Sequence, residues 1–109
     1  MAYDERLAER IREVADGEAG VTEKRMFGGL AFLVDGRLAV ASGQDGIMLR
    51  VDPAEAEELT RSPVVRRTRM RGRELAGWLD VDAAALEAQG DLRRWVAKGL
   101  DYARSLPPT

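Results

Sequence analysis

Cysteine and histidine are both missing from this sequence of 109 residues. Without cysteine there are no disulfides, thiol nucleophiles or thiolate zinc sites, and without histidine there is no imidazole for acid–base catalysis or metal binding. Nucleophilic catalysis would then rest on serines such as Ser42 and Ser62, which precede a glycine and a proline in ordinary turn contexts. We therefore expect a chain that is not an enzyme, with no catalytic residues, no cofactor and no metal.

Long apolar runs are missing as well. No stretch approaches the roughly 18 consecutive apolar residues of a membrane span, and the charged N-terminal segment lacks the apolar block of a signal peptide. With 45% hydrophobic and 33% charged residues, the composition is that of an ordinary globular protein. We expect residues 1–109 to form one domain that resides in the cytoplasm and has no membrane contact.

The net charge of −2 gives no overall field of the kind that attracts nucleic acid. The charges are unevenly spread, however. Residues 61–73 hold six arginines and no acid, whereas residues 52–60 hold four acids and no base. The first of these stretches is the one locally basic segment of the chain.

Four arginines of the basic segment alternate with other residues, so on a regular strand their guanidinium groups would project from one face. They are Arg67, Arg69, Arg71 and Arg73. One hypothesis is that they contact an anionic partner, which would make the chain a weak nucleic-acid binder. Nucleic-acid readers usually add exposed aromatic side chains for stacking, whereas four aromatics here fall on positions expected in the core. These are Phe27, Phe32, Trp78 and Trp95. We therefore favour a solvated sheet face balanced by nearby acids.

Hydrophobic periodicity predicts the order of the elements. Residues 3–15 show helical spacing and end at Asp16 and Gly17, because glycine tolerates the left-handed conformation that closes a helix. From residue 22 to residue 51 the period changes to two, which predicts an antiparallel series of strands joined by glycine-containing turns.

Residues 52–106 are predicted to form a helix, a hairpin, a short helical turn and a last helix. Asp52 and Pro53 begin a helix that runs to about Arg61. Residues 64–81 then form a hairpin bent near Gly72, and residues 82–89 a short helical turn. Residues 91–106 form the last helix, with Asp91 as its cap.

Asp35 and Gly36 are the clearest turn, because this pair supplies the positive φ angles of a type I′ hairpin. The expected register pairs Val34 with Arg37, Leu33 with Leu38, Phe32 with Ala39, and Ala31 with Val40.

Two other groups of residues have a simple structural interpretation. Asp80 and Asp82 could share acid–base or cation-binding work, but a position before a helix favours capping for at least one of them. Gly28 and Gly29 resemble a phosphate cradle only loosely, because neither a P-loop lysine nor a dinucleotide fingerprint follows. We interpret the two glycines as a structural turn.

Several motifs resemble a single protein family. The most specific is Lys24-Arg25-Met26-Phe27-Gly28-Gly29, followed by an aliphatic and aromatic strand and an Asp-Gly turn. Gly77-Trp78 is a weaker marker, and the C-terminal stretch LRRWVAKGLDYARSLPP also fits. On these motifs the chain resembles the TfoX N-terminal domain family nearly end to end.

The resemblance implies an α+β fold in the order helix, strands, helix, two strands, helix, similar to the secretion chaperones. The periodicity indicates the same order. The resemblance also implies a bacterial protein-interaction module linked to transcriptional or competence regulation, whose protein partner is unidentified. The longer relatives, the competence regulators, carry a second C-terminal domain. The regulatory role is an analogy, because a fold does not by itself specify a function.

Neither face of the expected central hairpin is polar. One face would carry Ala31, Leu33, Leu38 and Val40, and the other Leu30, Phe32, Val34, Ala39 and Ala41. The two long helices can cover one face, which leaves the other to a second copy of the chain or to the helix at residues 52–61. We expect a homodimer, with a monomer covered by that helix as the alternative.

Overall fold

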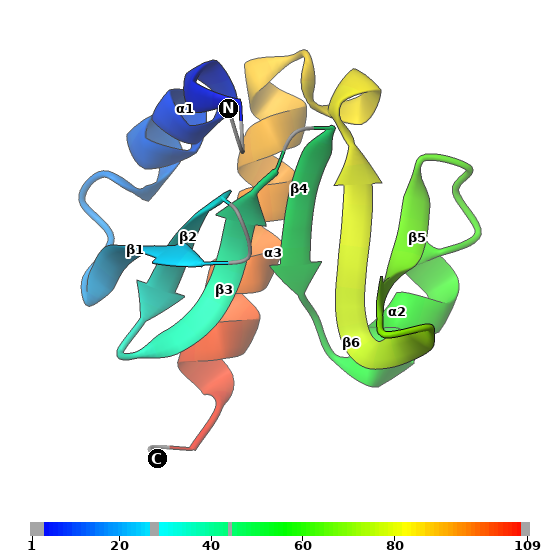
Figure 1. The fold of residues 1–109 in the computed structure, drawn as a ribbon. Helices are drawn as coiled ribbons and strands as arrows, with labels where there is room; N and C mark the ends of the chain where they lie inside the picture. Colours follow the sequence, from blue (N-terminus) through cyan, green and yellow to red (C-terminus); the bar gives the residue numbers. More distant parts are fainter. Residues whose placement is uncertain (1–3, 27–28, 44, 108–109) are drawn as a thin grey trace.

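The computed structural model describes residues 4–26, 29–43 and 45–107. Their elements are α1 (Glu5–Ala15), β1 (Val21–Met26), β2 (Gly29–Val34), β3 (Arg37–Ser42), β4 (Gly46–Arg50), α2 (Pro53–Leu59), β5 (Val65–Met70), β6 (Arg73–Asp82), the 3₁₀ turn η1 (Ala83–Leu86) and α3 (Gln89–Ser105) (Figure 1). The α+β class and the element order predicted from the sequence are confirmed. Within these residues, no helix is long and apolar enough to cross a membrane.

Side-chain caps determine where the first two helices begin. The carboxylate of Asp4 accepts a hydrogen bond from the backbone N–H of Leu7 at 3.1 Å, which satisfies a donor that the first turn of α1 leaves free. Asp52 accepts from the N–H of Ala54 at 2.9 Å, and Pro53 occupies the first position of α2. The start of α2 agrees with the sequence. The first helix was expected from Tyr3, which lies outside the described residues, and α1 begins at Glu5.

The last helix begins earlier than expected. It starts at Gln89, whose side chain accepts a hydrogen bond from Nε of Arg10 at 2.9 Å, so contacts with α1 hold this end of α3. Asp91 therefore lies inside the first turn, where it pairs with Arg94. The expected capping role of Asp91 was wrong.

The β2–β3 hairpin turns at Asp35 and Gly36, with φ of 51° and 83°, as a type I′ turn requires. The pairs next to the turn, Val34 with Arg37 and Leu33 with Leu38, have the expected register. Beyond them β3 contains a bulge, so Phe32 lies opposite Val40, and Ala31 opposite Ala41. The expected pairs of Phe32 with Ala39 and of Ala31 with Val40 were wrong, because one extra residue of β3 is accommodated at this point.

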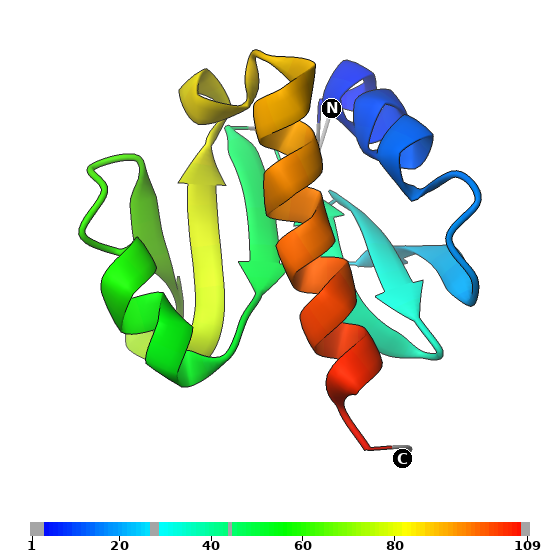
Figure 2. The same ribbon diagram turned by 180° about the vertical axis from the view of Figure 1, so that it is seen from behind.

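The six strands form an antiparallel sheet in the order β1-β2-β3-β4-β6-β5. Figure 2 shows α1, α2 and α3 on one face of this sheet, with α3 running along its middle. Between these helices and the sheet lies the core, which includes Ile11, Phe32, Val40, Leu49, Ala56, Leu79 and Val96. The alternative in which α2 covers the second face was wrong, because α2 buries Ala56 in the same core as the other helices.

Candidate functional site

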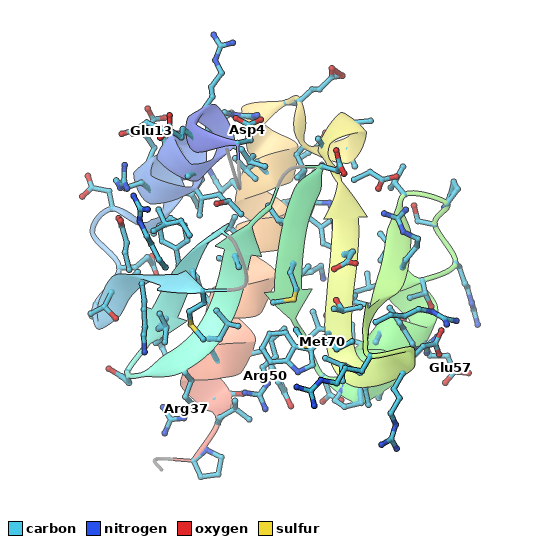
Figure 3. The ribbon with its side chains drawn as sticks, viewed as in Figure 1. Asp4, Glu13, Arg37, Arg50, Glu57 and Met70 are labelled. Atoms are coloured by element: carbon cyan, nitrogen blue, oxygen red, sulfur yellow. The ribbon has the colours of Figure 1, made fainter. Side chains whose placement is uncertain are left out.

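The sheet face opposite the helices, here called the open face, carries the candidate site (Figure 3). Successive side chains of a strand point to opposite faces. On β4, Ile47 and Leu49 enter the core, so Met48 and Arg50 belong to the open face. Among the described residues, no helix lies over this face.

The open face carries apolar as well as charged side chains. Its partly buried apolar side chains come from five strands and stand outside the core cluster: Met26, Leu33, Leu38, Met48 and Trp78. Phe32 and Trp95 pack in or against the core as expected. The expectation of a core position for Trp78 was wrong, because its neighbour Leu79 takes the core position on β6. Phe27 lies outside the described residues.

The bulge at Ala39 changes which residues share this face. It turns Val40 into the core opposite Phe32 and turns Ala41 onto the open face opposite Ala31 and Met48. The expected grouping of Val40 with Leu33 and Leu38 was therefore wrong.

One end of the open face is hollowed. The hollow has a volume of about 280 Å³, and it lies where the end of β1 meets the β3–β4 turn and the C-terminal end of β6. The side chains of Met26 and Met48 contribute its apolar lining, and those of Asp45, Arg66 and Asp80 its charged lining. The hollow is small, mixed in polarity and open to solvent.

The two carboxylates singled out by the sequence are held by β5. Asp80 accepts a hydrogen bond from the hydroxyl of Thr68 at 2.8 Å, and Asp82 pairs with Arg66 at 2.6 Å. The hydrogen bond from Arg66 lowers the pKa of Asp82 below its ordinary value. Neither side chain accepts a hydrogen bond from the start of η1. The expected capping role was wrong, because these carboxylates bind side chains of the neighbouring strand.

Arg50 has the most unusual surroundings on the open face. Its guanidinium carbon lies 5.3 Å from the ring centroid of Trp78 on β6 and 5.9 Å from that of Tyr102 on α3. Contact with α3 is possible because β3 and β4 pair over only three residues and then diverge (Figure 1). Both distances fall within the range of a cation–π interaction. The ion pairs between described residues do not include Arg50.

The four arginines of the basic segment do not share one face. Arg67 is partly buried opposite a core residue of β6, and a register shift separates it from Arg69. Arg71 lies in the turn with φ of 54°, and Arg73 begins the next strand. The expectation of one arginine face was wrong, because β5 is irregular and ends before Arg71. Arg69 pairs with Glu74 at 3.4 Å.

The remaining family-motif residues have mainly structural positions. Lys24 and Arg25 are exposed on β1, and Gly29 is buried at the start of β2. Gly77 has φ of 81°, and its carbonyl accepts a hydrogen bond from the N–H of Val51 at 2.8 Å. Gly28, and with it the expected turn, lies outside the described residues.

In the part of the chain that the structure describes, no group of three or more acidic side chains is placed to hold a metal ion.

A family model, the TfoX N-terminal domain, matches residues 13–103. The chain belongs to this family. The match spans strands β1 to β6, so every open-face residue named above lies within the residues that the model of the TfoX N-terminal domain matches. Searches of curated proteins and of solved structures gave no match.

Sequence reasoning did not identify Met48 or Arg50 of this TfoX N-terminal domain. The signal that could have found them is the alternation along β4, where Ile47 and Leu49 are aliphatic and Met48 and Arg50 are not. Tyr102 could not be connected with them, because its contact with Arg50 depends on the divergence of β3 from β4.

Proposed function

We propose that this TfoX N-terminal domain is a non-enzymatic protein-interaction module of the bacterial cytoplasm, linked to transcriptional or competence regulation, and that its protein partner docks on the open face. One observation carries the proposal. Within the described residues, α1, α2 and α3 lie on the other side of the sheet, while Met26, Met48 and Trp78 stand partly buried on the open face.

The side chains of this face suit protein recognition. Methionine is flexible and polarisable, so it adapts to the shape of an incoming surface. Tryptophan and arginine are enriched among the residues that contribute most to binding energy at protein interfaces, and here Trp78 and Arg50 lie together. The charged residues of the hollow, Asp80 and Arg66, would lie beside the apolar centre.

Affinity capture from cells that encode the domain tests this proposal. The baits are the wild type, Met48→Glu on the open face, and Ala54→Glu on the exposed surface of α2, which adds the same charge to the helix side. Circular dichroism checks that each bait is folded. We expect a protein that the wild type and Ala54→Glu retain and that Met48→Glu loses. The same set of proteins on all three baits would contradict the proposal.

A second copy of the chain is the other candidate occupant of the open face, because paired apolar faces are a common basis of twofold dimers. Sedimentation equilibrium distinguishes the two. If the chain forms a homodimer through this face, the 12.0 kDa wild type should self-associate. Met48→Glu should abolish this association, and Ala54→Glu should retain it.

Nucleic-acid binding is a second candidate function, and the exposed arginines Arg69, Arg71 and Arg73 at the tip of the β5–β6 hairpin favour it. Binding through phosphates weakens steeply as salt rises. The test is titration of labelled duplex DNA at several salt concentrations, with the wild type and a variant carrying serine at all three positions. Steeply salt-dependent binding that the variant loses would favour this candidate.

A further inference from the structure

We propose that Arg50 binds a carboxylate of the partner, so that the open face selects a protein segment in which an acidic residue lies next to a large apolar residue. This inference rests on the proposed docking function of the open face and adds the chemistry of the segment that docks there.

The surroundings of Arg50 leave its charge available. Trp78 and Tyr102 hold the guanidinium by its attraction to their rings, which supply no counter-charge. A guanidinium carries five N–H donors in its plane, a geometry that matches a carboxylate, and stacking on rings leaves those donors at the edge of the plane. Such a group is positioned in advance, so less side-chain entropy is lost when a carboxylate binds.

Two other charged side chains of the open face, Arg66 and Asp80, have partners within the chain, although the partner of Asp80 is an uncharged hydroxyl. Arg66 pairs with Asp82 at 2.6 Å, and Asp80 accepts from the hydroxyl of Thr68 at 2.8 Å. Arg50, unlike Arg66, is in none of the ion pairs between described residues, so it is a partly buried cation that an acidic group from the partner would complement.

The residues beside Arg50 call for an apolar group next to that acid. Met48 precedes it by two positions on the same face of β4, and Trp78 is its cross-strand neighbour on β6. Both are partly buried and lie outside the core. A large apolar side chain placed there would cover them and remove water from the carboxylate contact, which strengthens it.

The same surface is poorly suited to nucleic acid. Asp45 and Asp80 line the hollow at the other end of the open face and would repel phosphates. The ring of Trp78 is engaged by Arg50, which leaves less of it for stacking with a base.

The test is selection of short random peptides displayed on phage against the folded wild-type domain. We expect the enriched peptides to share an aspartate or glutamate next to a large apolar residue. In synthetic versions, replacing that acid by its amide should weaken binding to the wild type by about 10-fold or more, the range of a charge-assisted hydrogen bond.

Variants of the domain locate the contact. Arg50→Gln should weaken binding of the acidic peptide to the same extent. The affinity of this variant should then not change when the acid of the peptide is replaced by its amide, as a double-mutant cycle requires for a direct contact. Arg94→Gln removes the same charge from an exposed position on α3 and should leave binding unchanged. Arg50→Lys keeps the charge but lacks the planar fork of donors, so this variant should bind the acidic peptide with intermediate affinity. If Arg50→Gln does not fold, Arg50→Lys takes its place in the comparison.

Several results would overturn the inference. The inference fails if no peptide is enriched or if the enriched peptides lack an acid. It also fails if the amide replacement weakens binding equally for the wild type and for Arg50→Gln. If Met48→Glu still abolishes binding of non-acidic peptides, docking on the open face stands and only the carboxylate contact fails. If Met48→Glu and Arg50→Gln bind the peptides as the wild type does, both proposals fail. Duplex DNA is added as a competitor of the peptides. If it displaces them from the wild type but not from Arg50→Gln, the ligand of the open face is nucleic acid and not a protein segment.

Discussion

Gly99 of α3 lies directly against the backbone carbonyl of Ala39 on β3, so close that a Cβ atom at position 99 would stand 2.6 Å from the carbonyl oxygen. The contact places α3 against the bulged part of β3, on the side of the sheet where α1 and α2 also lie.

Replacing Gly99 by alanine should destabilise the domain by about 1–3 kcal/mol, because the added methyl group overpacks the helix against the sheet. Alanine also brings a gain of about 1 kcal/mol to a helix, and an approach of 2.6 Å to a backbone oxygen should cost more than this gain. Gly90→Ala is the matched control in the same helix, since nothing lies within 4 Å of its Cβ position. Urea unfolding should show a lower free energy of unfolding for Gly99→Ala only, and equal values for the two variants would contradict the close contact.

Replacing Thr68 by valine should also lower the free energy of unfolding, by about 1–2 kcal/mol, because Asp80 loses a hydrogen bond from a buried hydroxyl. The same substitution at Thr22, which is exposed on β1, should change it by less than about 0.5 kcal/mol. Thermal unfolding followed by circular dichroism compares the two. An unchanged midpoint for Thr68→Val would mean that the hydrogen bond contributes nothing to stability.

The ion pair between Arg12 on α1 and Glu23 on β1 predicts a pH dependence. The two groups form two hydrogen bonds, at 2.6 and 2.8 Å, and that contact lowers the pKa of Glu23. A lowered folded-state pKa means that the ionised carboxylate contributes stability at neutral pH, and this contribution is lost as the pH falls through that pKa. Glu23→Gln should therefore be less stable than the wild type at neutral pH, with the difference shrinking in acid.

Urea unfolding at a series of pH values measures this difference. Glu13→Gln on the exposed side of α1 is the control and should show a smaller difference from the wild type at neutral pH. A difference between the wild type and Glu23→Gln that stays constant from neutral pH into acid would contradict the assignment.

The sequence predicts the element order well because its signals are local. The Asp35-Gly36 turn and the cap Asp52 act on residues within a few positions of themselves. The arrangement of the sheet faces is not local. One bulge, at Ala39, reverses the faces of Val40 and Ala41, and the carbonyl of Ala39 lies against Gly99 of α3, which is remote in sequence.

The candidate site was predicted only in part for the same reason. Gly77 and Trp78 were identified as family markers, but the contact of Trp78 with Arg50 depends on the pairing of β4 with β6, which is remote in sequence. The arginines of residues 61–73 were the strongest charge signal, yet the end of β5 and its register shift disperse them. The residue that the structure singles out instead, Arg50, lies in a strand whose sequence shows no charge cluster.

Site-specific photo-crosslinking tests the central claim, docking on the open face, most directly. A photoreactive amino acid replaces either Met48 on that face or Arg94 on the outer surface of α3, where 77% of the side chain is exposed. Both variants are irradiated in cells that encode the domain, and the crosslinked products are identified by mass spectrometry. We predict a discrete protein adduct from position 48 and none from position 94. Adducts from position 94 alone, or the same adducts from both positions, would contradict the claim.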